Sequence, residues 1–243
     1  MRLDKYLSDS GFGSRSQVKE LIRSKSVRVN EHVVTSPKQS IDTQVDSVTV
    51  NQEPVHYEKY VYYMLNKPKG VISATEDDKH ATVMDLLDSI AVVKEAFPVG
   101  RLDIDTHGLL LITNNGGLAH ALLSPKRHVS KTYRALVQGI MTQEDQEKFQ
   151  EGIVLEDGFK CMPARLSILE SNAIEETSLV EITIKEGKFH QVKRMVKACG
   201  KTVMDLQRLS MGDLHLDPNL QKGDFRVLTN QERNMLKNYY SDI

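Results

Sequence analysis

The stretch Gly100-Arg101-Leu102-Asp103-Ile104-Asp105-Thr106-His107-Gly108-Leu109-Leu110-Leu111-Ile112-Thr113-Asn114-Asn115-Gly116 carries the most information in this sequence. Its four consecutive aliphatic residues predict a strand that is buried on both faces. Asp103 and Asp105 stand directly before this strand, where side chains are held rigidly and remain accessible. Asn115 is placed to cap a following helix. Composition alone would favour a loop carboxylate that hydrogen-bonds nearby amides, so the interpretation of Asp103 depends on the rest of the chain.

Strands and helices follow one another in mixed order on both sides of this stretch. We expect strands at residues 61–65, 109–113, 133–138, 179–184 and 213–216, and helices at residues 82–87, 117–123, 142–150 and 190–198. Hairpin-length links in a mixed order favour an α+β sheet domain over regular βαβ winding. We expect this domain to span residues 61–243, after a linker at residues 58–60 where the apolar periodicity lapses.

The first 57 residues form a separate small domain by the same criteria. Leu3 and Leu7 indicate a short amphipathic helix, and Ser14-Arg15-Ser16-Gln17 has the pattern of a capping box that starts a second one. Val27-Arg28-Val29 and the alternating valines from Val45 to Val50 indicate a small β element. A core of this size is marginal, which is typical of a docking module rather than of an enzyme.

Composition excludes several classes of protein. The chain has 243 residues, 32 Lys+Arg against 33 Asp+Glu, 40% hydrophobic residues and two Cys. No apolar run is long enough to cross a bilayer, and the charged N-terminus does not resemble a signal peptide. Two lone Cys form neither a disulfide framework nor a metal clip. We therefore expect a soluble, cytoplasmic protein.

The net charge of −1 conceals local basic clusters. Residues 15–28 contain five basic side chains and one acid, and residues 185–201 contain six basic side chains and one acid. Concentrated positive charge favours a polyanionic partner, because phosphates are captured by local potential. Solvated helix faces are the alternative for any one cluster.

The N-terminal pattern resembles an S4 RNA-binding domain. Arg2-Leu3-Asp4-Lys5, Ser14-Arg15 and Val27-Arg28-Val29-Asn30 carry this resemblance, which covers about the first 50 residues. In that family the second helix and the following strand contact the RNA backbone. The resemblance implies phosphate contacts by Arg15, Lys19, Arg23 and Arg28.

The remainder resembles the pseudouridine synthases that carry an S4 domain and modify ribosomal RNA. The catalytic motif is matched by Gly100-Arg101-Leu102-Asp103, followed by Thr106 and Gly108. Three further landmarks occur in order, namely Met64-Leu65-Asn66-Lys67-Pro68-Lys69-Gly70, Ser130-Lys131-Thr132-Tyr133 and the segment from Glu186 to Met195. The resemblance implies an α+β fold in which an S4 domain precedes a mixed or antiparallel-sheet catalytic domain, and a reaction that needs no cofactor or metal.

The resemblance also implies the roles of three residues. Asp103 would be the essential carboxylate, which either attacks the sugar C1′ or the uracil ring or removes a sugar proton. Lys193 would be its basic partner, because burial alone disfavours an ionised carboxylate and a nearby cation reverses that effect. Tyr133 would stack on the uracil and lie where the C5 proton leaves. For Tyr133, core packing on an alternating strand is the alternative.

The target nucleotide must be flipped out of its stack to reach a recessed aspartate. We expect phosphate contacts to offset this cost, and we expect Arg101 to fill the gap left by the base or to hold a phosphate. Asp105 would lie roughly 7 Å from Asp103 along an extended segment, at about 3.3 Å per residue, and we interpret it as structural or RNA-adjacent. Outside the S4 domain, the expected RNA contacts are Arg101, Lys131, Lys188 and Arg194.

These observations predict a monomeric rRNA pseudouridine synthase. Its motifs resemble those of the small-subunit (16S) enzymes most, so the expected partner is ribosomal RNA or a pre-ribosomal small-subunit particle. A large-subunit (23S) enzyme of the same family is the first alternative. A non-catalytic ribosome-assembly factor and a sugar hydrolase that uses Asp103 and Asp105 are the others.

Overall fold

The computed structural model describes residues 1–243, which divide into two compact units. Met1–Val61 and Leu87–Ala96 form the first unit, and Tyr62–Leu86 and Phe97–Ile243 form the second. The segment Leu87–Ala96, which the sequence division left in the second domain, contains α3 (Ser89–Val93). Lys94 of this segment donates a hydrogen bond to the Glu58 carbonyl and lies over the ring of Tyr57. The segment therefore joins the first unit through contacts that only the folded chain creates.

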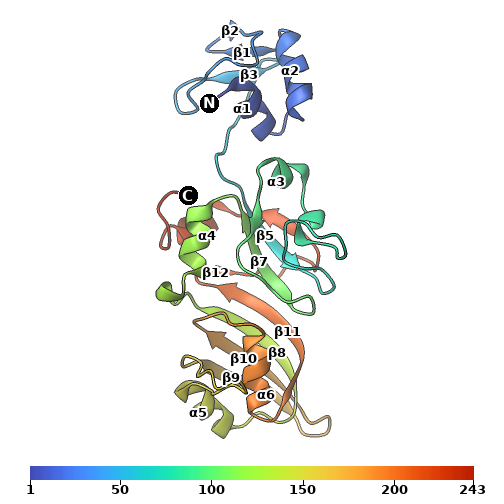
Figure 1. Ribbon diagram of the computed structural model, residues 1–243, viewed down its shortest axis with the longest axis vertical. Coiled ribbons are helices and arrows are strands. Elements are labelled where there is room, and N and C mark those ends of the chain that lie inside the picture. The colour runs from blue at the N-terminus through green and yellow to red at the C-terminus, as the bar shows by residue number, and fades with distance from the viewer. The chain divides into compact units, whose positions relative to one another are not determined.

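The first unit combines two helices with a four-stranded sheet (Figure 1). Its elements are α1 (Leu3–Asp9), α2 (Arg15–Arg23), β1 (Val27–Val29), β2 (His32–Val33), β3 (Val48–Val50) and β4 (Glu53–Pro54), and the strand order is β2-β1-β3-β4. The predicted capping box forms, since the Gln17 amide donates to Ser14 Oγ and the Ser14 amide donates to Gln17 Oε1. Leu3, Leu7 and Ile22 pack with the strand valines in one core.

The second unit is built on a nine-stranded mixed sheet. Its strands are β5 (Tyr62–Lys67), β6 (Phe97–Pro98), β7 (His107–Thr113), β8 (Lys131–Gln138), β9 (Arg165–Asn172), β10 (Thr177–Ile184), β11 (Thr202–Met211), β12 (Leu214–His215) and β13 (Phe225–Val227). The order along the sheet is β13-β5-β7-β11-β8-β10-β9, with β6 beside β7 and β12 beside β11. Only the β7–β11 pair is parallel, so the predicted mixed sheet is confirmed.

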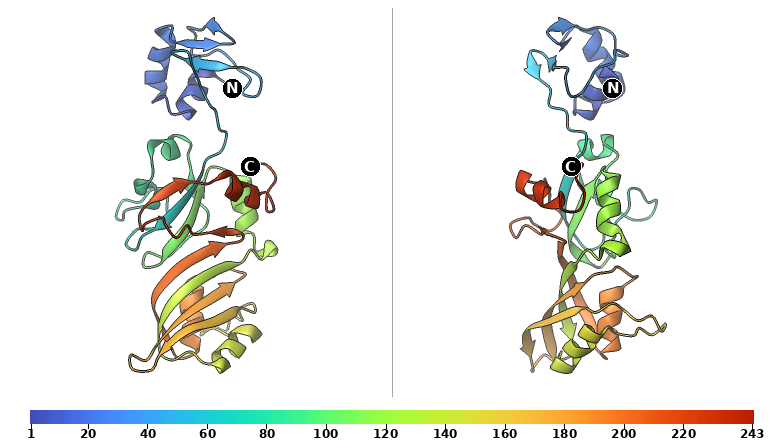
Figure 2. Two further views of the ribbon diagram at one scale, coloured as in Figure 1. Left: turned by 180° about the vertical axis from the view of Figure 1, so that it is seen from behind. Right: turned by 90° about the vertical axis from the view of Figure 1, so that its left-hand side faces the viewer.

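The helices of this unit cover the sheet. They are η1 (Val83–Leu86), α4 (Gly116–Leu123), η2 (Pro125–Arg127), α5 (Gln143–Glu151), α6 (Gln191–Ala198) and α7 (Asn230–Leu236). Asn115 caps α4 as expected, because the Leu118 amide donates to its side chain. Phe149 of α5 and Met195 of α6 share one core with strand residues such as Ile182, and the two helices lie on the same side of the sheet (Figure 2).

The strand β7 is buried along its whole length, as the aliphatic run predicted. Gly108 allows its close approach to β11. A Cβ at this position would lie 2.4 Å from the Arg208 carbonyl oxygen, and the backbone there has a φ of +106°. A side chain would therefore separate the parallel pair, so glycine sets the spacing of β7 and β11.

The sequence did not predict the strands β9 and β11. The buried positions of β11 include the polar residues Arg208 and Ser210, so no apolar alternation in the sequence marks the strand. The expected helix at 82–87 is the short 3₁₀ turn η1. No helix in the structure combines the length and the apolar character that a bilayer crossing requires.

Candidate active site

The turn that carries Asp103 is fixed by the loop that follows β5. Lys67 Nζ donates to the carbonyl oxygens of Pro68, Asp103 and Thr106 at 3.0, 3.1 and 3.0 Å. Ser73 Oγ donates to the Leu102 carbonyl and accepts from the Leu102 amide, both at 3.0 Å. The backbone on both sides of Asp103 is therefore held in place, as a preorganised catalytic group requires.

Lys67 is a positioning residue that the sequence analysis quoted within a motif but did not interpret. Its side chain is fully buried, and burial lowers its pKa to about 8 against the attraction of Asp103 and Asp105. Because the Lys67 ammonium donates hydrogen bonds to three carbonyl oxygens, it is not available to bind a phosphate of the RNA. Its place at the end of a strand, three residues before Gly70, was the available signal.

Lys193 joins the two carboxylates of this turn. It lies in the first turn of α6, and its Nζ donates to Asp103 Oδ2 at 3.0 Å and to Asp105 Oδ1 at 2.5 Å. Burial lowers the pKa of Lys193, but the hydrogen bonds to Asp105 and Asp103 outweigh that effect and raise it overall. The hydrogen bond from Lys193 lowers the pKa of Asp105. Asp105 is thus a second anchor of Lys193, a role that the sequence analysis missed.

The start of α6 is shaped by a tight turn. Gln191 donates to Glu186 Oε1 at 2.7 Å and accepts from the Lys188 amide at 2.9 Å. His190 has a left-handed backbone with a φ of +50°, and its Nε2 lies 3.6 Å from Asp103 Oδ1. The turn therefore directs two nitrogen-bearing side chains, His190 and Lys193, toward the same carboxylate.

Tyr133 reaches the site from the central strand β8. Lys131 and Tyr133 share the buried face of this strand, because β8 alternates between buried and less buried positions. Tyr133 lies opposite Ile182 of β10 on one side and opposite Arg208 of β11 on the other. The register of β11 shifts between Arg208 and Ser210, a bulge of the kind that re-aims side chains next to active sites.

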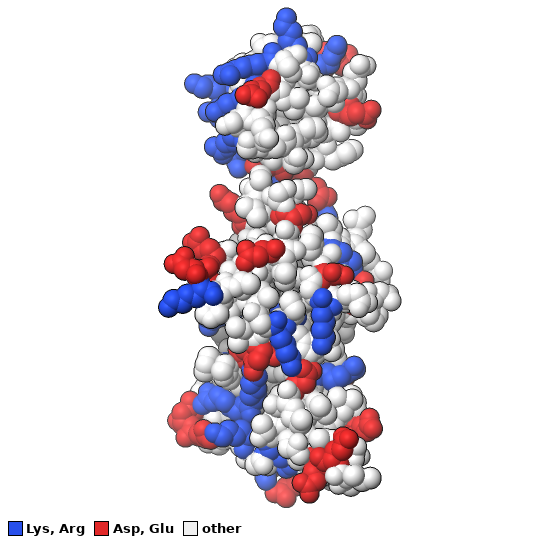
Figure 3. Space-filling model, turned by 90° about the vertical axis from the view of Figure 1, so that its right-hand side faces the viewer, with Lys and Arg blue, Asp and Glu red and all other residues white.

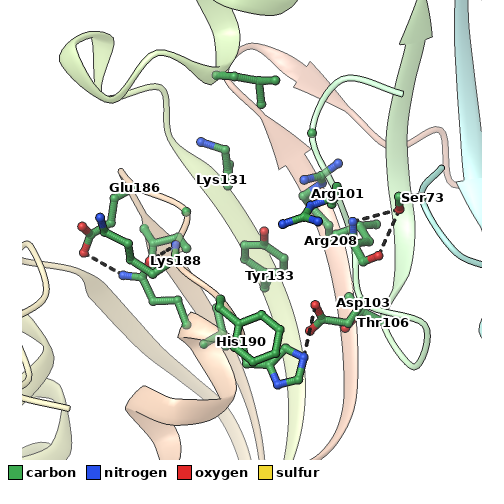
Figure 4. Close-up of a pocket in the computed structure, with 18 of the residues that line it drawn as sticks. Ser73, Arg101, Asp103, Thr106, Lys131, Tyr133, Glu186, Lys188, His190 and Arg208 are labelled. Carbon is green, nitrogen blue, oxygen red and sulfur yellow. Dashed lines mark hydrogen bonds and ion pairs between the residues drawn. The ribbon is translucent and has the colours of Figure 1, made fainter. Parts of the chain in front are cut away.

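One cavity of about 650 Å³ is lined by Asp103, Tyr133, His190 and Lys193, and its volume is within the range of ligand-binding pockets. Asp103 and His190 lie on one side of Tyr133, and Lys131, Arg101 and Arg208 lie on the side that carries its hydroxyl group (Figure 4). Lys188 also lines the cavity, where its ammonium lies 4.8 Å from the centre of the Phe159 ring.

The remaining predicted RNA contacts lie outside the cavity. Arg194 forms an ion pair with Asp157 at 2.6 Å and does not line the cavity. In the N-terminal unit, Arg15, Arg23 and Arg28 are exposed and Lys19 is half-buried. Basic side chains gather along one side of this unit (Figure 3). No group of three or more His, Cys, Asp or Glu side chains is placed to hold a metal ion.

The geometry argues against a glycoside hydrolase. Hydrolases of that kind place two carboxyl groups on either side of the scissile bond. Here a single ammonium, that of Lys193, hydrogen-bonds to both Asp103 and Asp105. Asp105 thus anchors the cation that also binds Asp103, instead of serving as a separate acid or base.

Comparison with known families identifies the class of this protein. Residues 1–45 match the S4 domain, and residues 61–198 match RNA pseudouridylate synthase. The chain belongs to the RNA pseudouridylate synthase family. It is similar over 97% of its length to a crystal structure of a pseudouridylate synthase, with a TM-score of 0.66, 34% identity and 99% of that chain covered.

Individual relatives match over almost their whole length. The chain is 45% identical to the uncharacterized RNA pseudouridine synthase YtzG of Bacillus subtilis, with 97% of this chain and 98% of that protein covered. It is 41% identical to the ribosomal large subunit pseudouridine synthase B of Bacillus subtilis, covering 97% and 95%. It is 37% identical to the ribosomal small subunit pseudouridine synthase A of Yersinia pestis, covering 96% of each.

Proposed function

We propose that this enzyme converts one uridine of ribosomal RNA to pseudouridine, with Asp103 as the essential carboxylate. The observation that carries this proposal is that Asp103, Lys193 and Tyr133 come from three distant parts of the chain and meet in one cavity. The membership of the pseudouridylate synthase family and the relatives named for ribosomal subunits support the reaction and the class of RNA. A non-catalytic RNA-binding factor would not need this convergence.

The reaction is an isomerisation and balances without a co-reactant. The bond between ribose C1′ and uracil N1 breaks, a bond between C1′ and C5 forms, C5 loses a proton and N1 gains one. Asp103 would act on the ribose or the ring as the ionised group. Lys193 supports this role because its ammonium donates a hydrogen bond to the carboxylate at 3.0 Å and holds it in place. Tyr133 would stack on the uracil and lie near its C5 atom.

RNA binding would divide between the S4 domain and the cavity rim. The exposed Arg15, Arg23 and Arg28, together with Lys19, would hold phosphates of the RNA. Arg101, Lys131 and Lys188 would contact the flipped nucleotide, whose extrusion costs a few kcal/mol of stacking. Arg194 is a weaker candidate, because its guanidinium already pairs with Asp157.

The small ribosomal subunit is the substrate that the sequence motifs favour, either as RNA or as a pre-ribosomal particle. The large subunit is a second candidate, because the identity to a large-subunit relative is 41% and that to a small-subunit relative is 37%. Action as a monomer in the cytoplasm stays a prediction from the sequence.

Mapping pseudouridine across all ribosomal RNA tests the proposal. The comparison is between cells that contain the protein, cells that lack it, and deleted cells that express Asp103→Asn. We expect one position to lose its pseudouridine in the deleted cells and in those with the variant. Restoration by Asp103→Asn, or an unchanged map in the deleted cells, would refute the proposal. The position itself assigns the subunit.

A further inference from the structure

The cavity contains two buried cations that have no carboxylate partner. Arg208 is 2% exposed and Lys131 is 9% exposed, and both line the cavity. Arg208 Nε donates to the Leu109 carbonyl at 2.8 Å, while its Nη2 is buried with no partner. Lys131 Nζ donates only to the Val129 carbonyl, at 3.1 Å. Burying a charge without a partner of opposite charge costs free energy, and a bound anion would supply that partner.

The carboxylates of the cavity do not neutralise these cations. Six basic side chains line the cavity against two acidic ones, Asp103 and Glu186. Asp103 accepts from Lys193, and Glu186 accepts from Gln191 and from the Met162 amide. The half of the cavity on the hydroxyl side of Tyr133 is therefore positive, whereas Asp103 lies on the other side (Figure 4).

We propose that Arg208 and Lys131 form a receptor for one phosphodiester group of the bound RNA, that of the nucleotide whose base enters the cavity. The inference rests on the proposed function and deepens it, because RNA carries its negative charge on phosphodiester groups alone. The guanidinium of Arg208, which lines the cavity and has an unpartnered Nη2, carries the planar fork that suits phosphate oxygens, and Lys131 adds a point charge. The β-bulge after Arg208 and the packing of Lys131 beside Tyr133 on β8 hold both groups before RNA arrives.

The position of the receptor fits a single nucleotide that crosses the cavity. Tyr133 lies between the Asp103 side and the cationic side (Figure 4). A ribose placed at Asp103 with its base against Tyr133 leaves its phosphate to the cationic half. The phosphate would then fix the nucleotide so that C1′ stays at the carboxylate, which is how remote binding contributes to orientation.

Binding of inorganic phosphate to the full-length protein tests the receptor without RNA. Thermal unfolding is followed as phosphate replaces chloride at constant ionic strength, for the wild type, Lys131→Met and Arg208→Gln. Arg165→Gln and Lys222→Met are matched controls, since both positions are exposed and lie outside the cavity. We expect phosphate to stabilise the wild type and both controls equally, and the receptor variants to bind it at least about tenfold more weakly. No stabilisation of the wild type, or equal stabilisation of all five proteins, would overturn the receptor.

A second measurement assigns the phosphate to the target nucleotide. The substrate is the rRNA fragment around the mapped position, with one linkage beside the target uridine replaced by a neutral methylphosphonate. We expect this linkage to lower kcat/KM of the wild type by about tenfold, and to lower that of Lys131→Met no further. If the methylphosphonate linkage lowers kcat/KM of Lys131→Met by the same factor as it lowers that of the wild type, the assignment is overturned. If Arg208→Gln does not fold, Arg208→Lys, which keeps the charge but loses the fork, takes its place. A wild type that binds phosphate but forms no pseudouridine would refute the proposed function and leave the anion receptor in place.

Discussion

Replacement of Lys193 by Met tests the central contact of the site. The ammonium of Lys193 is the group nearest to Asp103 Oδ2, at 3.0 Å, and its aliphatic stem can be retained by Met. A hydrogen bond to a charged group contributes about 1.5–3 kcal/mol, and we use the lower part of this range because the Asp103 side chain is 30% exposed to screening water. A loss of about 1.5–2.5 kcal/mol in the transition state lowers kcat/KM by about 10- to 70-fold.

Variants that keep the cation separate this effect from a loss of packing. Lys193→Arg keeps a positive charge beside Asp103 and should keep most of the rate. Asp105→Asn, which removes the second anchor but not the cation, should also keep most of the rate.

The assay is pseudouridine formation in the rRNA fragment under single-turnover conditions. Thermal unfolding of each variant provides the control for folding. The reasoning fails if Lys193→Met has the rate of the wild type. It also fails if Lys193→Arg lowers the rate as far as Lys193→Met does, because that pattern indicates packing rather than charge.

Three further predictions follow from single contacts. Tyr133→Phe should keep RNA binding but lower the single-turnover rate if the hydroxyl takes part in proton transfer; an unchanged rate would restrict Tyr133 to stacking on the base. Lys131→Met should raise the free energy of unfolding at neutral pH by up to about 3 kcal/mol, because burial lowers the pKa of Lys131 from 10.5 to about 8. Between about pH 8 and pH 10.5 the unfolded wild type binds more protons than the folded protein does, so the free energy of unfolding of the wild type rises with pH. That of Lys131→Met should rise less, and urea titrations at about pH 8 and about pH 10.5 measure the difference. Gly108→Ala should destabilise the protein by about 2–5 kcal/mol, since its Cβ would meet the Arg208 backbone at a positive φ, and wild-type stability in urea would contradict the close approach of β7 and β11.

The increase in stability expected for Lys131→Met has a functional meaning. A residue that is retained for packing should lower stability when it is replaced. Lys131 is expected to do the opposite while its loss weakens phosphate binding, because a buried charge without a carboxylate costs free energy until an anion neutralises it. Opposite signs in the two assays therefore distinguish a binding role from a structural one.

Local sequence patterns were sufficient for the elements that bury apolar side chains. The aliphatic run of β7, the Ser14–Gln17 capping box and the Asn115 cap all act over a few residues, and each forms as predicted. The strand β11 was not predicted, because two of its buried positions are the polar residues Arg208 and Ser210 and the apolar alternation is therefore interrupted. The grouping of Leu87–Ala96 with the first unit was not predicted either, since it depends on contacts with residues 57 and 58.

The sequence by itself determined the candidates for the site: motif resemblance indicated Asp103, Tyr133 and Lys193, because residue identity and order are properties of the chain alone. Only the tertiary structure decided how they are held. Lys67 fixes the Asp103 turn, two carboxylates share Lys193, and Arg208 is buried beside the cavity without a carboxylate partner. Each of these arrangements joins residues that are far apart in the chain. Local propensity acts over a few residues, whereas the charge environment of a buried group depends on every strand and helix that encloses it.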